Sequence, residues 1–136
     1  MKIRLEENAK TPTRAHDTDA GLDLYAMHSG LLRVGRTATF HTGVHVQLPR
    51  ETVGLLLPKS GLMVRNDILT FGVIDSGYSG EILVHMFNFG SADYYVQAGD
   101  KISQLVVSRI VYEDIEVVDE IEGGERGQNG FGSTGA

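Results

Sequence analysis

The 136-residue sequence contains no cysteine. A disulfide framework and a thiolate metal site are therefore both excluded. No apolar run approaches the ~20 residues that a membrane-spanning helix needs. The first ten residues, MKIRLEENAK, are charged and lack the apolar core of a signal peptide. These absences predict a soluble, cytoplasmic protein that has no membrane partner.

Basic residues are in the minority, with 12 lysine and arginine residues against 18 aspartate and glutamate residues. The net charge of −6 argues against general binding of nucleic acid or of an anionic membrane, because both need a basic field. A polyanion can still bind if local donors or a metal ion compensate its charge. We predict no metal site from the histidines. His41 and His45 lie four residues apart, but in a strand-like segment this spacing does not give them the shared face that a helix would.

Helical periodicity is also scarce, because apolar residues mostly repeat with a period of two. In GVHVQL, Val44, Val46 and Leu48 alternate with polar residues. EILVHMFNF is apolar on nearly both faces, which predicts a strand buried on both sides. DKISQLVVSRIVY and IEVVDEI are further β-rich runs, and SGLMVRN at 60–66 is the one predicted helix, with Ser60 as its N-cap. We therefore predict one all-β domain, a jelly-roll-like barrel or sandwich with one short helix.

The composition changes near residue 120, where glycine becomes frequent. We predict a β domain over residues 1–120 and a flexible glycine-rich C-terminal arm over residues 121–136. The final tract, GERGQNGFGSTGA, carries Arg126, a residue suited to gripping anions, and Phe131, a residue suited to stacking. A plain flexible tail of glycine, serine and scattered charge does not account for this pair.

Two short stretches in the β domain each allow two interpretations. AGLDLYA at 20–26 places Asp23 in an apolar strand, either facing outward from a half-buried strand or holding a base, a cation or a metal-bound water. LPKSGL at 57–62 places Lys59, Ser60 and Gly61 at a strand-to-helix junction. Ser60 is there either only a helix cap or part of an anion site made of backbone N–H groups, a hydroxyl and a cation.

The stretch FGVIDSGYSGEI at 71–82 combines more features. Asp75, Ser76 and Gly77 suit a turn, and Tyr78 follows it directly. We expect a hairpin that presents a carboxylate, an aromatic ring and exposed backbone edges to one slot. GDKISQL at 99–105 adds Gln104 among apolar residues, where a buried amide must find hydrogen-bond partners.

Taken in order, AGLDLYA, PKSGL, GVIDSGYSGEI, GDKISQL and RGQNGFGSTG resemble the five motifs of the trimeric dUTPases. The resemblance runs from about residue 20 to the end of the chain. It implies a homotrimer of jelly-roll-like subunits that converts dUTP to dUMP and pyrophosphate with Mg²⁺. It also implies that each active site draws on all three chains, with the C-terminal arm closing over the site of a neighbouring subunit.

The same resemblance implies roles for single residues. Asp75 activates the water that attacks the α-phosphorus, and Tyr78 packs under the deoxyribose, where a ribose 2′-hydroxyl would collide. Mg²⁺ is held mainly by phosphate oxygens and waters, and Asp23 helps to order metal-bound water or neighbouring residues. The implied substrate-binding residues are Lys59, Ser60, Gly61, Gly72, Val73, Ile74, Tyr78, Gln104, Arg126, Phe131, Gly132, Ser133 and Thr134. In the arm, Arg126 binds the γ-phosphate and Phe131 stacks on uracil. Gly132, Ser133 and Thr134 supply hydrogen-bond donors from small residues.

The chain departs from the family pattern at a few positions. Lys59 and Lys101 stand where arginine is common, so these positions keep the charge but lose the bidentate fork. Asn129 replaces a usual glycine in the arm. DILTF, before Asp75, lacks the asparagine that some members use on the base, so the reading of uracil should rest more on the backbone.

Two other functions remain to be separated from dUTP hydrolysis. The related dCTP deaminases need a glutamate in the strand after the hairpin, where this chain has His85. A trimeric binding protein without catalysis is the other alternative, although Asp75, Tyr78, Arg126 and Phe131 are all present. Products would separate all three, because hydrolysis releases pyrophosphate and deamination releases ammonia.

Overall fold

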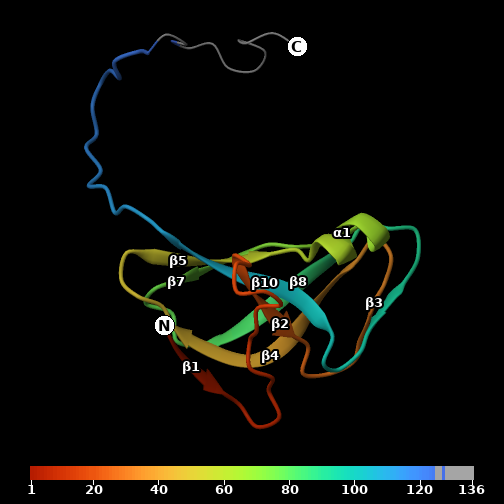
Figure 1. Cartoon of the computed structure of the whole chain (residues 1–136). Helices are drawn as coiled ribbons and strands as arrows, with labels where there is room; N and C mark the ends of the chain where they lie inside the picture. The colour runs from red at the N-terminus through yellow and green to blue at the C-terminus, as the bar shows by residue number, and fades with distance from the viewer. Residues whose placement is uncertain (125–126, 128–136) are drawn as a thin grey trace.

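The computed structural model describes residues 1–124 and 127, and they form two four-stranded antiparallel sheets, a small two-stranded sheet and one short helix (Figure 1). No helix in these described residues is long and apolar enough to cross a membrane. The elements in chain order are β1 (Lys2–Leu5), β2 (Gly21–Tyr25), β3 (Gly30–Leu32), β4 (Thr37–Gln47), β5 (Thr52–Leu57), α1 (Ser60–Asn66), β6 (Ile68–Thr70), β7 (Gly72–Asp75), β8 (Glu81–Asn88), β9 (Tyr94–Val96) and β10 (Lys101–Arg109).

The strand order is β1-β4-β8-β6 in one large sheet and β2-β10-β5-β7 in the other, while β3 pairs with β9. Alternate residues of the large sheets point into one apolar core. Its members include Leu24 and Leu105 from one sheet and Val44, Ile82 and Val84 from the other, each at most 1% exposed. This arrangement confirms the predicted all-β, jelly-roll-like class with a single short helix.

Local patterning placed several elements correctly. The helix spans 60–66 as predicted, and Val44, Val46 and Leu48 face the core as the alternation required. The N-cap is wrong, however, because Lys59 occupies that position and makes no side-chain cap hydrogen bond. Ser60 is instead the first residue of the helix, and its side chain is exposed.

The prediction that EILVHMFNF is buried on both sides is wrong for the described chain. In β8, Ile82, Val84 and Met86 are fully buried, whereas Leu83 on the opposite face is 43% exposed. The prediction of a strand for IEVVDEI is also wrong, because no strand is present at 115–121. After β10 the chain runs away from both large sheets (Figure 1), and Ile115 and Val117 are each 93% exposed.

The stretch around Asp75 does not form a hairpin, contrary to the prediction. Strand β7 pairs with β5 in one sheet, and β8 pairs with β4 and β6 in the other. Residues 76–80, which we call the crossover turn, therefore pass from one sheet to the other. Because β7 is the last strand of its sheet, its outer edge carries no strand partner in the described residues.

Candidate active site

A hollow lies beside the crossover turn, and four of the predicted residues line it. Its volume is about 220 Å³, and it is lined by Val73, Ile74, Asp75, Tyr78, Glu81 and Leu83. Asp75 ends β7 with its side chain exposed, while the preceding Ile74 is buried and fixes the strand in the core. The sequence therefore brings a carboxylate and an aromatic ring to one concave surface.

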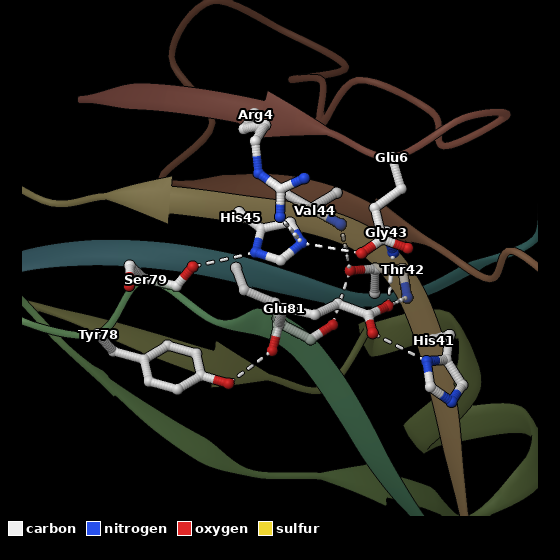
Figure 2. Close-up of polar contacts among 11 residues, drawn as sticks. Arg4, Glu6, His41, Thr42, Gly43, Val44, His45, Tyr78, Ser79 and Glu81 are labelled. Atoms are coloured by element: carbon white, nitrogen blue, oxygen red, sulfur yellow. Dashed lines mark hydrogen bonds and ion pairs between the residues drawn. The ribbon is translucent and has the colours of Figure 1, made fainter.

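The ring of Tyr78 is held in place by main-chain contacts. Its amide N–H donates to the Asp75 carbonyl at 3.0 Å, and its hydroxyl donates to the Glu81 carbonyl at 2.9 Å (Figure 2). The ring lies so close to Gly80 that a Cβ there would come within 2.9 Å of the ring atom Cε2. Tyr78 is 44% exposed, so part of the ring is open to a ligand.

Gly72, Val73 and Ile74 form most of β7, beside the same hollow. Gly72 pairs with Leu56 and Ile74 with Gly54 on β5, so one edge of β7 is occupied. An edge strand presents N–H and C=O groups along its other side, which suit a planar ligand with alternating acceptors and donors. The predicted base-reading segment thus lies at an open sheet edge.

A second group of predicted residues surrounds Asp23. Asp23 is 3% exposed, so the interpretation of an outward-facing side chain is wrong. Its Oδ1 accepts a short hydrogen bond from the Lys59 ammonium, and its Oδ2 lies 2.7 Å from the Lys101 ammonium in an ion pair without good hydrogen-bond geometry. Burial is the largest single influence on the Asp23 pKa and raises it, but the contacts with Lys101 and Lys59 outweigh burial and leave the pKa lowered.

The sequence predicts a phosphate contact for Lys59 but contains no local signal of its ion pair with Asp23. It also predicts no role for Lys101 beyond its departure from arginine. The ion pairs join β2 to the junction before α1 and to the start of β10. Lys59 lies 36 positions and Lys101 lies 78 positions from Asp23 in the sequence. With both oxygens of Asp23 engaged by ammonium groups, its role near metal-bound water stays a prediction.

Gln104 pairs with Asp23 across β10 and β2, and its amide donates to the Pro58 carbonyl at 3.0 Å. This contact confirms that the amide has a structural partner. The amide therefore lies beside the start of α1. There the first helical hydrogen bonds are donated by Leu62 and Met63 to the Lys59 carbonyl, so the N–H groups of Ser60 and Gly61 precede the helical ladder.

Arg65 is a further cation at this helix start that the sequence reasoning missed. A Cβ on Gly61 would meet the Arg65 guanidinium at 2.6 Å, so the side chain folds back over the first turn. The spacing of four residues within a helix is the signal that could have revealed it. Ser60, Gly61, Gln104 and Arg65 together offer an anion a hydroxyl, backbone N–H groups, an amide and a positive charge.

The remaining predicted residues, Arg126, Phe131, Gly132, Ser133 and Thr134, lie outside the described residues. Within residues 1–124 and 127 there is no group of three or more histidine, aspartate or glutamate side chains that could hold a metal ion. A divalent cation at this site would therefore need most of its ligands from a bound polyanion and from water.

Comparison with known proteins places the chain in a family. The family model described as dUTPase matches residues 7–135. A deoxyuridine 5'-triphosphate nucleotidohydrolase from Clostridium tetani is 41% identical over 139 residues, covering 99% of this chain and 96% of the relative. One from Rattus norvegicus is 40% identical over 134 residues, covering 98% of this chain and 65% of the relative.

Solved structures agree with the sequence comparison. A mutant dUTPase of Staphylococcus bacteriophage 80alpha, solved with dUpNHpp, matches with a TM-score of 0.92 at 28% identity, covering 99% of this chain and 98% of that one. A mutant dUTPase from phage phi11 of S. aureus, described as coordinating a structural Mg(II) ion, matches with a TM-score of 0.82 at 29% identity, covering 88% and 96%. The chain belongs to the dUTPase family.

Proposed function

We propose that this protein hydrolyses dUTP to dUMP and pyrophosphate. The observation that carries the proposal is the single hollow in which Asp75, Tyr78 and the open edge of β7 meet. The carboxylate suits a water nucleophile, the ring suits a sugar, and the strand edge suits a planar base. In a cell this activity supplies dUMP for dTMP synthesis and keeps uracil out of DNA.

Uracil is read by the backbone of residues 72–74. Its edge presents an acceptor, a donor and an acceptor, which the N–H and C=O groups of an edge strand can pair with. Such hydrogen bonds strongly disfavour a base without the matching groups, because a buried polar group of the strand would then be left without a partner. The 5-methyl group of thymine would not fit against a strand edge, so dTTP is a poor substrate.

Tyr78 sets the sugar specificity by its shape. Its hydroxyl is bonded to the Glu81 carbonyl and its ring lies over Gly80, so the ring cannot retreat from a ligand. A deoxyribose packs on the open part of the ring, and a ribose 2′-hydroxyl collides with it. UTP is therefore a far poorer substrate than dUTP.

Asp75 is the general base. The attacking water gives its proton to the Asp75 carboxylate while its oxygen forms a bond to the α-phosphorus. The bond from that phosphorus to the bridging oxygen of the β-phosphate breaks, and pyrophosphate leaves. A positioned base of this kind contributes typically ~10²–10⁴-fold to the rate.

The triphosphate lies against Ser60, Gly61 and Gln104, with Lys59 and Arg65 supplying positive charge. The buried Asp23 holds the two lysine ammonium groups in position through the contacts described above. Mg²⁺ fits this donor set through the phosphate oxygens and water rather than through a protein cage, and when bound it neutralises the charge of the polyphosphate. In the arm, Arg126 binds the γ-phosphate, Phe131 stacks on uracil, and Gly132, Ser133 and Thr134 donate hydrogen bonds.

We also propose a homotrimer with shared sites, because Asp75 and Gln104 lie apart within one chain. Asp75 faces Val53 at one end of β5, whereas Gln104 faces Leu57 near the other end. Four residues of strand separate these positions by roughly 13 Å, and Ser60 lies farther on. The two groups also lie on strands that flank β5 on opposite sides. We propose that each site takes Asp75 from one subunit and Gln104 from another.

The exposed surface also favours self-association. Leu69, Val73 and Leu83 expose large apolar side chains on β6, β7 and β8, and Ile115 and Val117 do the same on the segment after β10. Large apolar side chains gathered at a surface are a feature of protein interfaces. The β domain and the arm from residue 121 therefore act across subunits, the arm covering the site of a neighbour.

The direct test incubates the protein with Mg²⁺ and, separately, with dUTP, UTP and dCTP. Pyrophosphate released from dUTP alone supports the proposal. Ammonia released from dCTP identifies a deaminase instead. Binding of dUTP without any product identifies a nucleotide-gated binding protein.

A further inference from the structure

We infer that Glu81 is a positioning residue that fixes Tyr78, and through it the preference for deoxyribose, by docking the crossover turn on a bulge of β4. The inference rests on the proposed function for its substrate but on the geometry below for its mechanism. Glu81 has no motif role assigned above, and its side chain reaches toward His41, Thr42 and Gly43 on β4 (Figure 2).

The hydroxyl of Tyr78 is bonded to the main chain of Glu81 rather than to another side chain. The ring orientation therefore depends on where the Glu81 carbonyl lies. Residue 81 is also the first residue of β8, next to a turn of five residues, so strand pairing alone holds it weakly. A second contact that fixes residue 81 would therefore limit the mobility of the Tyr78 ring.

This second contact, the anchor, is made by the Glu81 carboxylate. Its Oε1 accepts from the Thr42 amide at 3.0 Å and from the Gly43 amide at 2.8 Å, and its Oε2 contacts His41 Nδ1 at 2.9 Å (Figure 2). The side chain is 17% exposed. Charge-assisted bonds to buried amides are among the stronger hydrogen bonds in proteins.

The amides are available because β4 carries a bulge. The pairing with β8 shifts between His41, which faces Leu83, and His45, which faces Glu81. Three residues of β4 therefore stand opposite one residue of β8, and Gly43 adopts a φ of 64°. Bulged residues lose their ladder partners, and here the carboxylate replaces them.

The bulge is itself held from two sides. The Thr42 hydroxyl donates to the Ile82 carbonyl at 2.7 Å and accepts from the Val44 amide at 3.1 Å. The amide of Glu6 donates to the Gly43 carbonyl at 2.8 Å. The bulge of β4 is thus held rigidly where it binds the Glu81 carboxylate. The position of the bulge therefore fixes the Glu81 carbonyl and, through it, the ring of Tyr78.

His45 adds a second tether to the turn. Its Nδ1 lies 3.0 Å from the Ser79 carbonyl and donates to it, while its Nε2 contacts Arg4 and Glu6 on the other side (Figure 2). The crossover turn is therefore attached to β4 at Ser79 and at Glu81, the residues on either side of Gly80. Tyr78 lies directly before these two attachments.

The carboxylate remains charged at neutral pH. Burial is the largest influence on the Glu81 pKa and raises it, but the bonds from Gly43, His41 and Thr42 together leave the pKa lowered. The anchor is therefore fully formed at neutral and mildly acidic pH. Its loss requires mutation rather than an ordinary change of pH.

The test compares the ratio of kcat/KM for dUTP to kcat/KM for UTP in the wild-type protein, in Glu81→Gln and in Glu81→Ala. A ratio measured on one preparation is independent of the fraction of folded enzyme. We expect the ratio to fall about tenfold in Glu81→Ala and less in Glu81→Gln, which keeps one acceptor for the bulge amides. Glu7→Gln, at an exposed position, is the matched control and should keep the wild-type ratio.

Tyr78→Phe extends the test, because it removes only the hydroxyl that meets the Glu81 carbonyl. If both residues act through one contact, adding Glu81→Ala to Tyr78→Phe should lower the ratio little further. Amide hydrogen exchange of residues 76–80 in the substrate-free protein should accelerate about tenfold in Glu81→Ala. Unchanged exchange in this turn overturns the inference even if the wild-type protein proves not to hydrolyse dUTP.

The outcomes separate the two proposals. An active wild-type enzyme whose dUTP-to-UTP ratio is intact in Glu81→Ala overturns the positioning role, however much the melting temperature falls. A wild-type protein without activity on dUTP, combined with faster exchange in Glu81→Ala, overturns the proposed function and supports the anchor.

Discussion

Asp75 and Gln104 are attached to the same strand, β5, four residues apart: Asp75 faces Val53 and Gln104 faces Leu57. The carboxylate proposed to activate water and the amide proposed to bind phosphate thus lie at different ends of one rigid element. We therefore propose that each active site combines Asp75 of one subunit with Gln104 of another.

The first prediction follows from this separation. Analytical ultracentrifugation at micromolar concentration should give the mass of three chains. The exposed apolar side chains of β6, β7 and β8 should be buried in that assembly. The backbone amides of these strands should then exchange hydrogen more slowly in the trimer than in dissociated subunits. A monomer that hydrolyses dUTP at the same concentration would contradict the shared-site proposal.

A mixing experiment tests whether the halves come from different chains. Asp75→Asn removes the base, and Gly61→Asp places a carboxylate against the phosphates, so each variant alone should be inactive. If the two are unfolded together and refolded, random assembly should restore about one quarter of the sites, because base and phosphate residues are then drawn independently from different chains. Full inactivity of the refolded mixture would indicate that each site lies within one chain.

The second prediction concerns the arm. Deletion of residues 124–136 should leave the β domain folded, because its core lies entirely within β1 to β10. Hydrolysis of dUTP should be largely lost, and Phe131→Ala alone should cost about 1–3 kcal/mol, the usual contribution of a base stack. Circular dichroism checks the fold. Turnover at the full rate by the truncated protein would remove the covering role of the arm.

The third prediction concerns the buried carboxylate. Asp23→Asn leaves the Lys59 and Lys101 ammonium groups close together without their counterion. Because both ammonium groups are partly exposed and can be solvated, the loss should be about 1–2 kcal/mol rather than the larger cost of a fully buried pair, and urea unfolding would detect it. Glu7→Gln, the same change of charge at an exposed position, should change the free energy of unfolding by less than about 0.5 kcal/mol. Equal stability of Asp23→Asn and the wild-type protein would show that the ion pairs contribute nothing.

The fourth prediction concerns pH. The hydrogen bond to Glu6 is the largest of the influences that raise the His45 pKa, followed by the bond to the Ser79 carbonyl, while burial and Arg4 lower it. Because the pKa is higher in the folded state, the stabilisation is fully present below the ordinary value of 6.5 and is lost as the pH rises through the folded value. His45→Gln should therefore cost more stability at pH about 5.5 than at pH about 9.

The control for this pH dependence is His28→Gln, at an exposed position. It should change stability equally at the two pH values. Guanidinium unfolding at each pH gives the free energies directly. If His45→Gln has the same cost at both values, the ring makes its contacts without a change of proton affinity.

Much of this architecture follows from local sequence. The alternation around Val46 and the helix at 60–66 are short-range patterns, and the structure keeps both. Asp75 ends a strand as predicted, because Ile74 before it supplies a buried side chain and Ser76 and Gly77 after it favour a turn. Local chemistry is sufficient for these features.

Local sequence patterns do not show which strands pair with each other when these strands lie far apart in the sequence. A strand, a turn and a strand have the same periodicity whether they form a hairpin or pass between sheets, so the partners of β7 and β8 could not be predicted. Glu81 lies 39 residues from the Thr42 amide that it binds, and Lys101 lies 78 residues from Asp23. Such contacts depend on topology, which only the folded chain supplies.

The measurement that tests the central claim most directly is single-turnover formation of dUMP from dUTP by Asp75→Asn. Asparagine keeps the size of the side chain and its suitability for the turn but removes the charge and most of the basicity. The rate should fall by about 10²–10⁴-fold, while the affinity for a non-hydrolysable dUTP analogue and the melting temperature stay close to those of the wild-type protein. A folded variant that binds the analogue and forms dUMP at the wild-type rate would contradict the catalytic role of Asp75.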